Sequence, residues 1–268
     1  YMYCANIGLK TLDVSNNPAL TTLFCLDNSL TNLDLSNNPA LTNLRCEDNQ
    51  LTDLDLSNNP ALYYLSCSNN QLISLNVTNN PLLTTLRCHR NQLTGLDDGN
   101  NPVLSSLSCY NNPLMSLNVS NNLELTDLYC SNNKLTTLDV SKNIKLKNLE
   151  CDSNQLELLD VSKNTKLISL HCYSNRMNLV ELYKAKNNGA SYISLSISSQ
   201  TLPAETVYSM QQITIPAVDG TSSDISVSDA TLGTHYTYTD GVLTFLKTGT
   251  YTVTMTNSKV TNKNGELA

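Results

Sequence analysis

The sequence predicts a mainly β protein in two parts: a solenoid of 21-residue coils built from parallel strands, followed by a small β-sandwich. The first observation is that all nine cysteines lie 21 residues apart, from Cys4 to Cys172. The second is that leucines recur with the same period, without exception, in the columns that contain Leu20 and Leu23. The third is that this period stops near residue 190, where alternating apolar and polar residues begin. A fixed period in this range is typical of a solenoid whose repeats pack only on their neighbours.

Composition narrows the class of partner. The chain has 268 residues, a formal net charge of -7 and a pI near 4.9. Nucleic acids and anionic membranes attract basic surfaces, so neither is expected as a partner. No run of 18 apolar residues occurs, so no transmembrane segment is predicted. The chain begins at Tyr1 inside a repeat, and we expect a processed or trimmed fragment that is monomeric.

The first half of each repeat is predicted to be a strand on the concave side of the solenoid. The segment Leu20-x-x-Leu23-x-Cys25-x-x-Asn28 matches a leucine-rich pattern in which a short parallel strand turns at the Asn. A second Asn column begins at Asn17. Because an amide can both donate to and accept from the main chain of the neighbouring coil, both columns are predicted to be structural.

The second half of each repeat follows the same pattern more loosely. Residues 30 to 38 are an example, and Pro39 or an equivalent proline follows them in five coils. A proline within a segment of only about a dozen residues leaves little room for an α-helix. We therefore expect extended segments, turns or short 3₁₀ pieces on the convex side.

The cysteines are predicted to be free, buried thiols. In-register residues on successive parallel strands lie roughly 4.8 Å apart with their side chains parallel, which does not suit a disulfide. No Cys-x-x-Cys pair, the usual metal clamp, occurs. Cysteine instead takes the third apolar place of each strand, where a small hydrophobic side chain fits.

These features together resemble the cysteine-type leucine-rich repeats of bacterial surface proteins, of the internalin J-like kind. The resemblance rests on the 21-residue period, the Leu-Asp-Val-Ser-x-Asn and Leu-x-x-Leu-x-Cys-x-x-Asn-Gln-Leu segments, and the cysteine column, and it covers about two thirds of the chain. It implies an extracellular or cell-surface bacterial protein whose solenoid binds something, often a host or glycan surface. It implies no particular ligand, because the repeat motif is scaffold.

One coil departs from the repeat. Asp98, in Leu96-Asp97-Asp98-Gly99, stands where the other coils carry Val or Leu. A buried carboxylate without a partner is costly. Two interpretations follow: a bulge that Gly99 permits, or a cation or water beside Asp97 and Asp98.

The repeat decays after Asn175. Asn178-x-x-Glu181 is typical of a helix capping box, so a short capping helix is expected there. A turn predicted at residues 187–189 marks the domain boundary. The predicted domains are therefore residues 1–188, the solenoid with its cap, and residues 189–268, the β-sandwich.

The second domain is predicted from alternation and turns. Strands are expected at residues 192–197, 213–215, 224–227, 235–238, 242–246 and 251–255. Asp240-Gly241 predicts a two-residue hairpin. Gly249-x-Tyr251-x-Val253 resembles the tyrosine corner of immunoglobulin-like domains, which implies an immunoglobulin-like sandwich without its usual disulfide or core Trp.

No motif predicts catalysis, a cofactor or a metal. His89 and His171 lie about four coils apart, roughly 19 Å, so they cannot share a metal or a proton. Phosphate-binding loops, HExxH and nucleophile elbows are absent from the sequence. The Asp column that begins at Asp13 could form a calcium ladder, but Asn76 and Asn118 replace Asp in it, which favours hydrogen bonding at turns.

The residues beside each cysteine predict a binding face. They differ widely between repeats, whereas the outward residues of the Asp-Ser half barely change, and scaffold needs do not explain such diversity. A merely solvated face is the alternative. The candidate ligand-binding residues are Arg45, Tyr64, Arg87, His89, Tyr110, Tyr129, Glu150, Asp152, His171 and Tyr173. Arg45, Arg87 and His89 are expected to form a basic neighbourhood, and Tyr110 through Tyr173 an aromatic and acidic one.

The sequence thus favours a secreted or cell-surface bacterial recognition or adhesion protein that binds a protein ligand, such as one on a host surface. Two alternatives stay open. In the first, Tyr64, Tyr110, Tyr129 and Tyr173 stack on the sugar rings of a glycan. In the second, the chain is a passive structural stalk.

Overall fold

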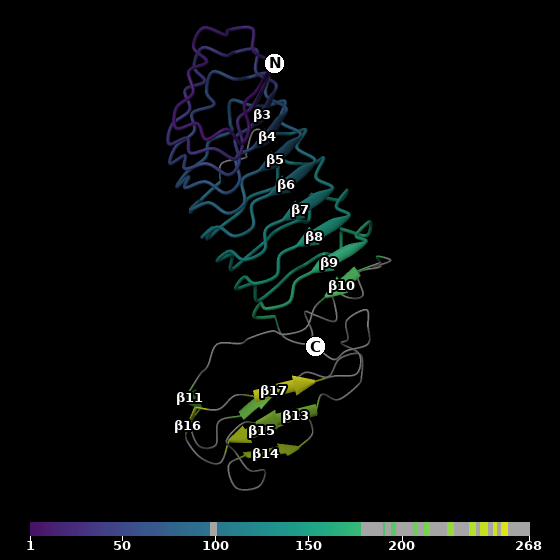
Figure 1. The fold of residues 1–268 in the computed structure, drawn as a ribbon. Helices are drawn as coiled ribbons and strands as arrows, with labels where there is room; N and C mark the ends of the chain where they lie inside the picture. The colour runs from purple at the N-terminus through teal and green to yellow at the C-terminus, as the bar shows by residue number, and fades with distance from the viewer. Residues whose placement is uncertain are drawn as a thin grey trace.

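Each repeat forms one coil, and the coils stack so that their strands make a single parallel sheet (Figure 1). The computed structural model describes residues 1–96 and 101–177, Ala190, and eight strands between residues 194 and 256. The strands of the parallel sheet, in spatial and chain order, are β1 (Met2–Tyr3), β2 (Thr22–Phe24), β3 (Asn43–Arg45), β4 (Tyr64–Ser66), β5 (Thr85–Arg87), β6 (Ser106–Ser108), β7 (Asp127–Tyr129), β8 (Asn148–Glu150), β9 (Ser169–His171) and β10 (Ser194–Ser196). The predicted leucine-rich-repeat solenoid is confirmed.

The core consists of in-register leucine and cysteine columns. Leu23 lies opposite Leu44, and Leu44 opposite Leu65, so identical side chains stack from coil to coil. All three are fully buried. Each buried leucine contributes about 1.5–3 kcal/mol relative to an exposed one, so the repeated columns supply most of the stabilisation.

The cysteine column lies beside these leucines. All nine cysteines are within the described residues, none is in a disulfide, and eight are buried, Cys4 being the half-buried one. The thiol of Cys46 donates to the carbonyl of Ser66 on the next coil at 3.6 Å. Burial raises the pKa of Cys67 and of Cys172 to about 12, so these thiols are protonated at neutral pH. Their chemistry is that of a small hydrophobic residue.

The first Asn column links each turn to the preceding coil. The Nδ2 amide of Asn49 donates to the carbonyls of Cys25, Cys46 and Glu47 at 3.0–3.2 Å, and its Oδ1 accepts the N–H of Leu30 at 2.9 Å. The same pattern recurs in every coil from Asn28 to Asn175. It supplies partners to buried main-chain groups that the turn leaves outside the sheet.

The second Asn column also donates hydrogen bonds to main-chain carbonyls of the preceding coil, on the other side of the solenoid. Asn59 is fully buried, and its Nδ2 donates to the carbonyls of Leu35 and Asn38 at 3.1 and 2.9 Å. The predicted structural role of both columns is confirmed.

One residue in each of nine coils has a left-handed backbone, with φ between 51° and 56°, and none of these residues is Gly. Eight of them directly precede an Asn of the first column, and the ninth, Asn6, precedes Ile7. Asn and Asp, which tolerate this conformation best, occupy six of the nine positions; Arg90, Ser153 and Ser174 occupy the others. The sharp turn therefore accounts for the Asn and Asp preference at this position.

The convex side consists of turns and extended segments. No helix occurs in the residues that the structure describes, as the prolines of the second half-repeat predict. Consequently that part of the chain contains no helix that could cross a membrane. The expected capping helix after Asn178 and the irregular coil at Asp97, Asp98 and Gly99 lie outside the described residues.

The remaining strands form three small antiparallel sheets, β11 with β16, β12 with β15 and β14, and β13 with β17. They are β11 (Thr206–Val207), β12 (Gln212–Thr214), β13 (Asp224–Val227), β14 (Tyr236–Thr239), β15 (Val242–Phe245), β16 (Gly249–Thr250) and β17 (Val253–Thr256). Five predicted strands match β12, β13, β14, β15 and β17 within a few residues. Thr239 pairs with Val242, as the predicted hairpin requires. The immunoglobulin-like arrangement stays a prediction, and Tyr251 of its tyrosine corner lies outside the described residues.

One predicted strand belongs to a different sheet. Residues 192–197 were expected to open the sandwich, but β10 pairs in parallel with β9, with Leu195 opposite Leu170, and extends the solenoid sheet. The physical reason is that the last coil leaves an edge of unpaired main-chain groups, which a further strand covers. The boundary expected between residues 188 and 189 itself lies outside the described residues.

Removing one amide of the first Asn column should destabilise the solenoid strongly. Asn70→Ala leaves the buried N–H of Leu51 without its partner, at about 1–3 kcal/mol. It also removes the hydrogen bonds from Asn70 to the carbonyls of Cys46 and Cys67, which keep Asn49 and Asn91 as donors, at about 0.5–1.5 kcal/mol each. We expect the free energy of unfolding in guanidinium chloride to fall by roughly 3 kcal/mol or more. The exposed Asn58→Ala is the matched control and should change it by less than about 0.5 kcal/mol. Equal effects of the two substitutions would contradict the role assigned to the column.

The thiols provide a second test. At pH 8 the folded protein should react with a thiol reagent at Cys4 alone, and the unfolded protein at nine cysteines. Because burial raises the thiol pKa from 9.0 to about 12 at Cys67, the unfolded state releases its protons first, and stability should decline as pH rises above 9. A count near one after unfolding without reductant would mean that the cysteines are paired.

Candidate functional site

The candidate residues lie on and just after the strands of the solenoid sheet. In each strand the central leucine is buried and its neighbours face outward, because alternate side chains point to opposite faces. We call the outward residues beside each strand leucine and each cysteine the variable face. Arg45, Tyr64, Arg87, Tyr129, Glu150 and His171 lie in β3, β4, β5, β7, β8 and β9, and His89, Tyr110, Asp152 and Tyr173 directly follow a cysteine. The structure therefore places all ten on one surface.

The expected basic neighbourhood carries less charge than its composition indicates. Arg45 and Arg87 lie two coils apart, each paired with Ser66 between them. Nε of Arg45 donates to Oε1 of Glu47 at 2.7 Å, and this hydrogen bond raises the pKa of Arg45. The Arg45 guanidinium also lies 5.5 Å from the ring centroid of Phe24. Glu47 thus neutralises Arg45 within its own coil.

Arg87 is exposed and lies over an aromatic ring. Its guanidinium carbon is 5.9 Å from the ring centroid of Tyr64 on the preceding coil. A cation in this position is attracted to the ring face by about 0.5–1 kcal/mol at an exposed site. In the described part of the chain no carboxylate forms a salt bridge with Arg87, so its charge faces solvent.

His89 stacks on Tyr110. Their ring centroids are 4.2 Å apart with an interplanar angle of 11°, and Nδ1 of His89 lies 3.2 Å from Oγ of Ser108. Burial lowers the pKa of His89 to about 4, and the charges of Arg90 and Arg87 contribute in the same direction. His89 is therefore neutral at pH 7 and serves this face as an aromatic side chain.

The aromatic and acidic neighbourhood was expected to include Tyr110, but Tyr110 stacks on His89, and the contacts of the other members lie in the later coils. His171 lies with Nδ1 4.0 Å from Oε1 of Glu150, and its Nε2 lies 2.8 Å from Oγ of Ser194. Ser131 donates to Oδ1 of Asp152 at 2.6 Å. Burial raises the pKa of Tyr173, and Asp152 raises it further. These side chains hold one another in defined positions at the last coils of the sheet.

Several contacting residues were not among the candidates. Phe24 directly precedes Cys25, and Glu47 directly follows Cys46. Both therefore belong to the varied positions beside the cysteines from which the candidates were chosen. Asp127 adjoins Tyr129, whose pKa is raised by burial, then by Asp127 and Glu150. Arg90 could have been found because it departs from the Asn and Asp preference of its column, whereas no pattern in the sequence indicates that Ser194 contacts His171.

The turn side of the coils is built differently. Oδ1 of Asp34 accepts the N–H of Ser36 at 2.9 Å, and Asp13, Asp55, Asp139 and Asp160 repeat this bond. The Ser36 hydrogen bonds lower the pKa of Asp34. In the described ranges no three His, Cys, Asp or Glu residues converge as metal ligands would. The Asp side chains thus make hydrogen bonds within the turns, which is the role that the sequence favoured over a calcium ladder.

Known structures share this architecture. The functional domain of InlJ from Listeria monocytogenes, described as including a cysteine ladder, is 29% identical over 97% of this chain and 63% of its own length, with a TM-score of 0.68. An internalin, InlF of the same species, is 24% identical over 70% of this chain and 66% of its own, with a TM-score of 0.54. The chain thus spans less than two thirds of either structure.

More distant structures show the fold alone. The plant peptide hormone receptor RGFR1 in complex with RGF2 is 18% identical over 70% of this chain and 41% of its own, with a TM-score of 0.57. No protein-family model matches the chain, and no curated protein matches it. The internalin-like solenoid with a cysteine ladder is confirmed by these similarities.

The neutrality of His89 can be measured. We expect its ring protons to titrate by NMR with a midpoint near pH 4. Because the folded pKa lies below the ordinary 6.5, the unfolded state binds the proton more readily, and stability should fall as pH drops from about 6.5 to 4. His89→Gln, which cannot take up this proton, should lessen that fall. A midpoint at 6.5 or above would show that His89 is charged or exposed on this face.

Proposed function

We propose that this chain is part of a secreted or cell-surface bacterial recognition protein that binds a protein ligand through the variable face. Leucine-rich-repeat structures similar to it include internalins and a receptor bound to a peptide hormone. The antiparallel strands after the solenoid would serve as a spacer. An adhesive role at a host surface is the form of recognition that the internalin-like solenoid favours.

The observation that carries this proposal is the contrast between the two sides of each coil. On the turn side the same hydrogen bond recurs, from the N–H of a Ser to Oδ1 of the Asp two residues before it, so this Asp column serves the scaffold. On the variable face side chains contact one another, as Arg87 contacts Tyr64 and His89 contacts Tyr110. The scaffold needs none of these contacts, because the Asn and leucine columns already hold the coils together.

The residues of this face suit a protein partner. Tyrosine and arginine dominate the energetic centres of protein interfaces, and the face presents both in contact with each other, as the exposed Arg87 lies over the partly buried Tyr64. Side chains held by their neighbours lose less conformational entropy on binding. The charge also changes along the face, from Arg87 to the carboxylates of Asp127 and Glu150, so a partner of complementary charge would bind in one orientation.

The glycan alternative depends on open tyrosine faces. Sugar rings stack on the flat face of an aromatic side chain, yet Tyr110 is covered on one face by His89, and Tyr64 by Arg87. Each of these two tyrosines keeps one face, which is enough for a sugar ring to stack on. The glycan alternative therefore stays open, and the binding experiment below decides between the two ligands.

The experiment compares matched substitutions against defined binding partners. Purified protein is applied to a glycan array and to host cell-surface protein extracts, and affinity is then measured for the partner found. Arg87→Ala and Tyr110→Ala should each weaken binding by about 2 kcal/mol or more, roughly 30-fold. Ser57→Ala and Asp34→Ala on the turn side are the controls and should leave affinity unchanged.

Three results would contradict the proposal. Loss of affinity in the turn-side variants alone would place the ligand elsewhere on the solenoid. Binding to the glycan array without binding to protein would support the glycan alternative. Absence of binding in both arms would support a passive stalk.

A further inference from the structure

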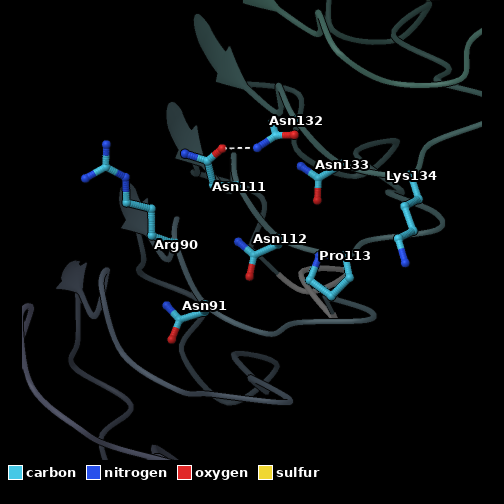
Figure 2. A pocket seen from close by; sticks show the side chains of 8 residues that line it. All are labelled: Arg90, Asn91, Asn111, Asn112, Pro113, Asn132, Asn133 and Lys134. Carbon is cyan, nitrogen blue, oxygen red and sulfur yellow. Dashed lines mark hydrogen bonds between the residues drawn. The ribbon is translucent and has the colours of Figure 1, made fainter.

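A hollow of about 400 Å³ opens at the rim of the sheet, where the strands end (Figure 2). Figure 2 shows Arg90 and Lys134 at opposite ends of the residues that line it, with Pro113 between them. Its lining includes no acidic side chain, although the whole chain has a net charge of -7. The hollow adjoins the variable face, because Arg90 directly follows His89 and Asn111 directly follows Tyr110. We call it the rim notch.

The rim notch exists because one column of the repeat is interrupted. The residue after each Asn of the first column is long in the flanking coils, where Gln71, Gln92, Lys134 and Gln155 occupy it. Pro113 replaces this long side chain with a short ring. In the other coils this residue also donates its N–H to the preceding coil, as Gln92 does to the carbonyl of Leu72 at 2.9 Å. Proline has no N–H, so the equivalent bond to Leu93 cannot form.

The polar groups of the rim notch fall into two sets. Asn91, Asn112 and Asn133 belong to the Asn column, and their amides are occupied by main-chain partners. Asn111 and Asn132 bond to each other, with Asn132 donating to Oδ1 of Asn111, and the amino group of Asn111 and the carbonyl oxygen of Asn132 point away from this bond in opposite directions (Figure 2). The groups that can meet a ligand are therefore these two and the exposed cations Arg90 and Lys134.

We propose that the rim notch binds an acidic segment of the protein ligand, with one carboxylate on Arg90 and another on Lys134. Arg90 and Lys134 lie two coils apart, roughly 10 Å at the strand spacing, and Lys134 is two residues further along its coil than Asn132, the residue in register with Arg90, so their main chains are more than 10 Å apart. Both side chains are long, so their charged ends can adjust to the spacing of two carboxylates. In an extended polyproline-type segment, side chains three residues apart lie on one side and are separated by about 9 Å. The hollow is shallow and open to solvent, so it suits a segment laid across it better than an enclosed small molecule. This inference rests on the proposed function in taking the ligand to be a protein.

The probe is a blocked peptide with the core Glu-Pro-Pro-Glu, and the matched control has the core Gln-Pro-Pro-Gln. Each is titrated into the full ¹⁵N-labelled chain and followed by amide chemical shifts. The acidic peptide should perturb residues 110–112 and 131–134, and the amide control should not. Arg90→Gln and Lys134→Gln, both at exposed positions, should each weaken binding about fivefold.

Pro113→Gln is the decisive variant. It restores the residue that the neighbouring coils carry, so it should fill the rim notch and regain the main-chain bond to Leu93. Binding of the acidic peptide should fall at least about tenfold while the unfolding midpoint stays equal or rises. Binding loss together with retained stability separates the site from a general folding defect.

Two outcomes would overturn the inference. The first is peptide binding that Pro113→Gln leaves intact or that perturbs residues elsewhere. The second is binding of an oligogalacturonate, which carries carboxylates on sugars, when the acidic peptide does not bind. The turn-side variant Ser57→Ala is the control and should leave peptide binding unchanged. The peptide titration needs no identified partner, so peptide binding at the rim notch when the variable face finds no protein ligand separates failure of the proposed function from failure at the rim notch.

Discussion

The structure depends on the amides of the two Asn columns. A coil that turns after only three residues of strand leaves main-chain groups buried without partners, and each such group is costly. Asn49 supplies four hydrogen bonds at one turn, and Asn59 supplies two at the other. Because each amide reaches into the preceding coil, successive coils are held in one register. The in-register leucine and cysteine columns follow from that constraint.

Because the Asn amides hold the coils together, the residues of the variable face are not needed for folding. Once the amides and the buried columns hold the coils, the outward residues beside each cysteine can change without loss of the scaffold. The result is a surface on which side chains are positioned by one another, as His89 is by Tyr110 and Ser108. Such a surface can evolve its binding properties while the stability of the solenoid is maintained, as in other repeat architectures.

Departures from a column are informative in a structure of this kind. Pro113 interrupts a column of long side chains and opens the rim notch, and Arg90 occupies a left-handed position where Asn and Asp are preferred. Neither change improves the scaffold, since one removes a main-chain donor and the other strains the backbone. Both occur beside the variable face, where a ligand would offset their cost.

The sequence by itself determined the period, the inward leucines and cysteines, the structural Asn columns and the lack of room for a convex helix, because each is a local pattern repeated in every coil. It also placed the candidate residues on one surface. Only the tertiary structure decided that Glu47 neutralises Arg45, that burial keeps His89 neutral, and that β10 joins the solenoid sheet. These outcomes depend on contacts between particular side chains, or on an open sheet edge, which a repeat pattern does not encode.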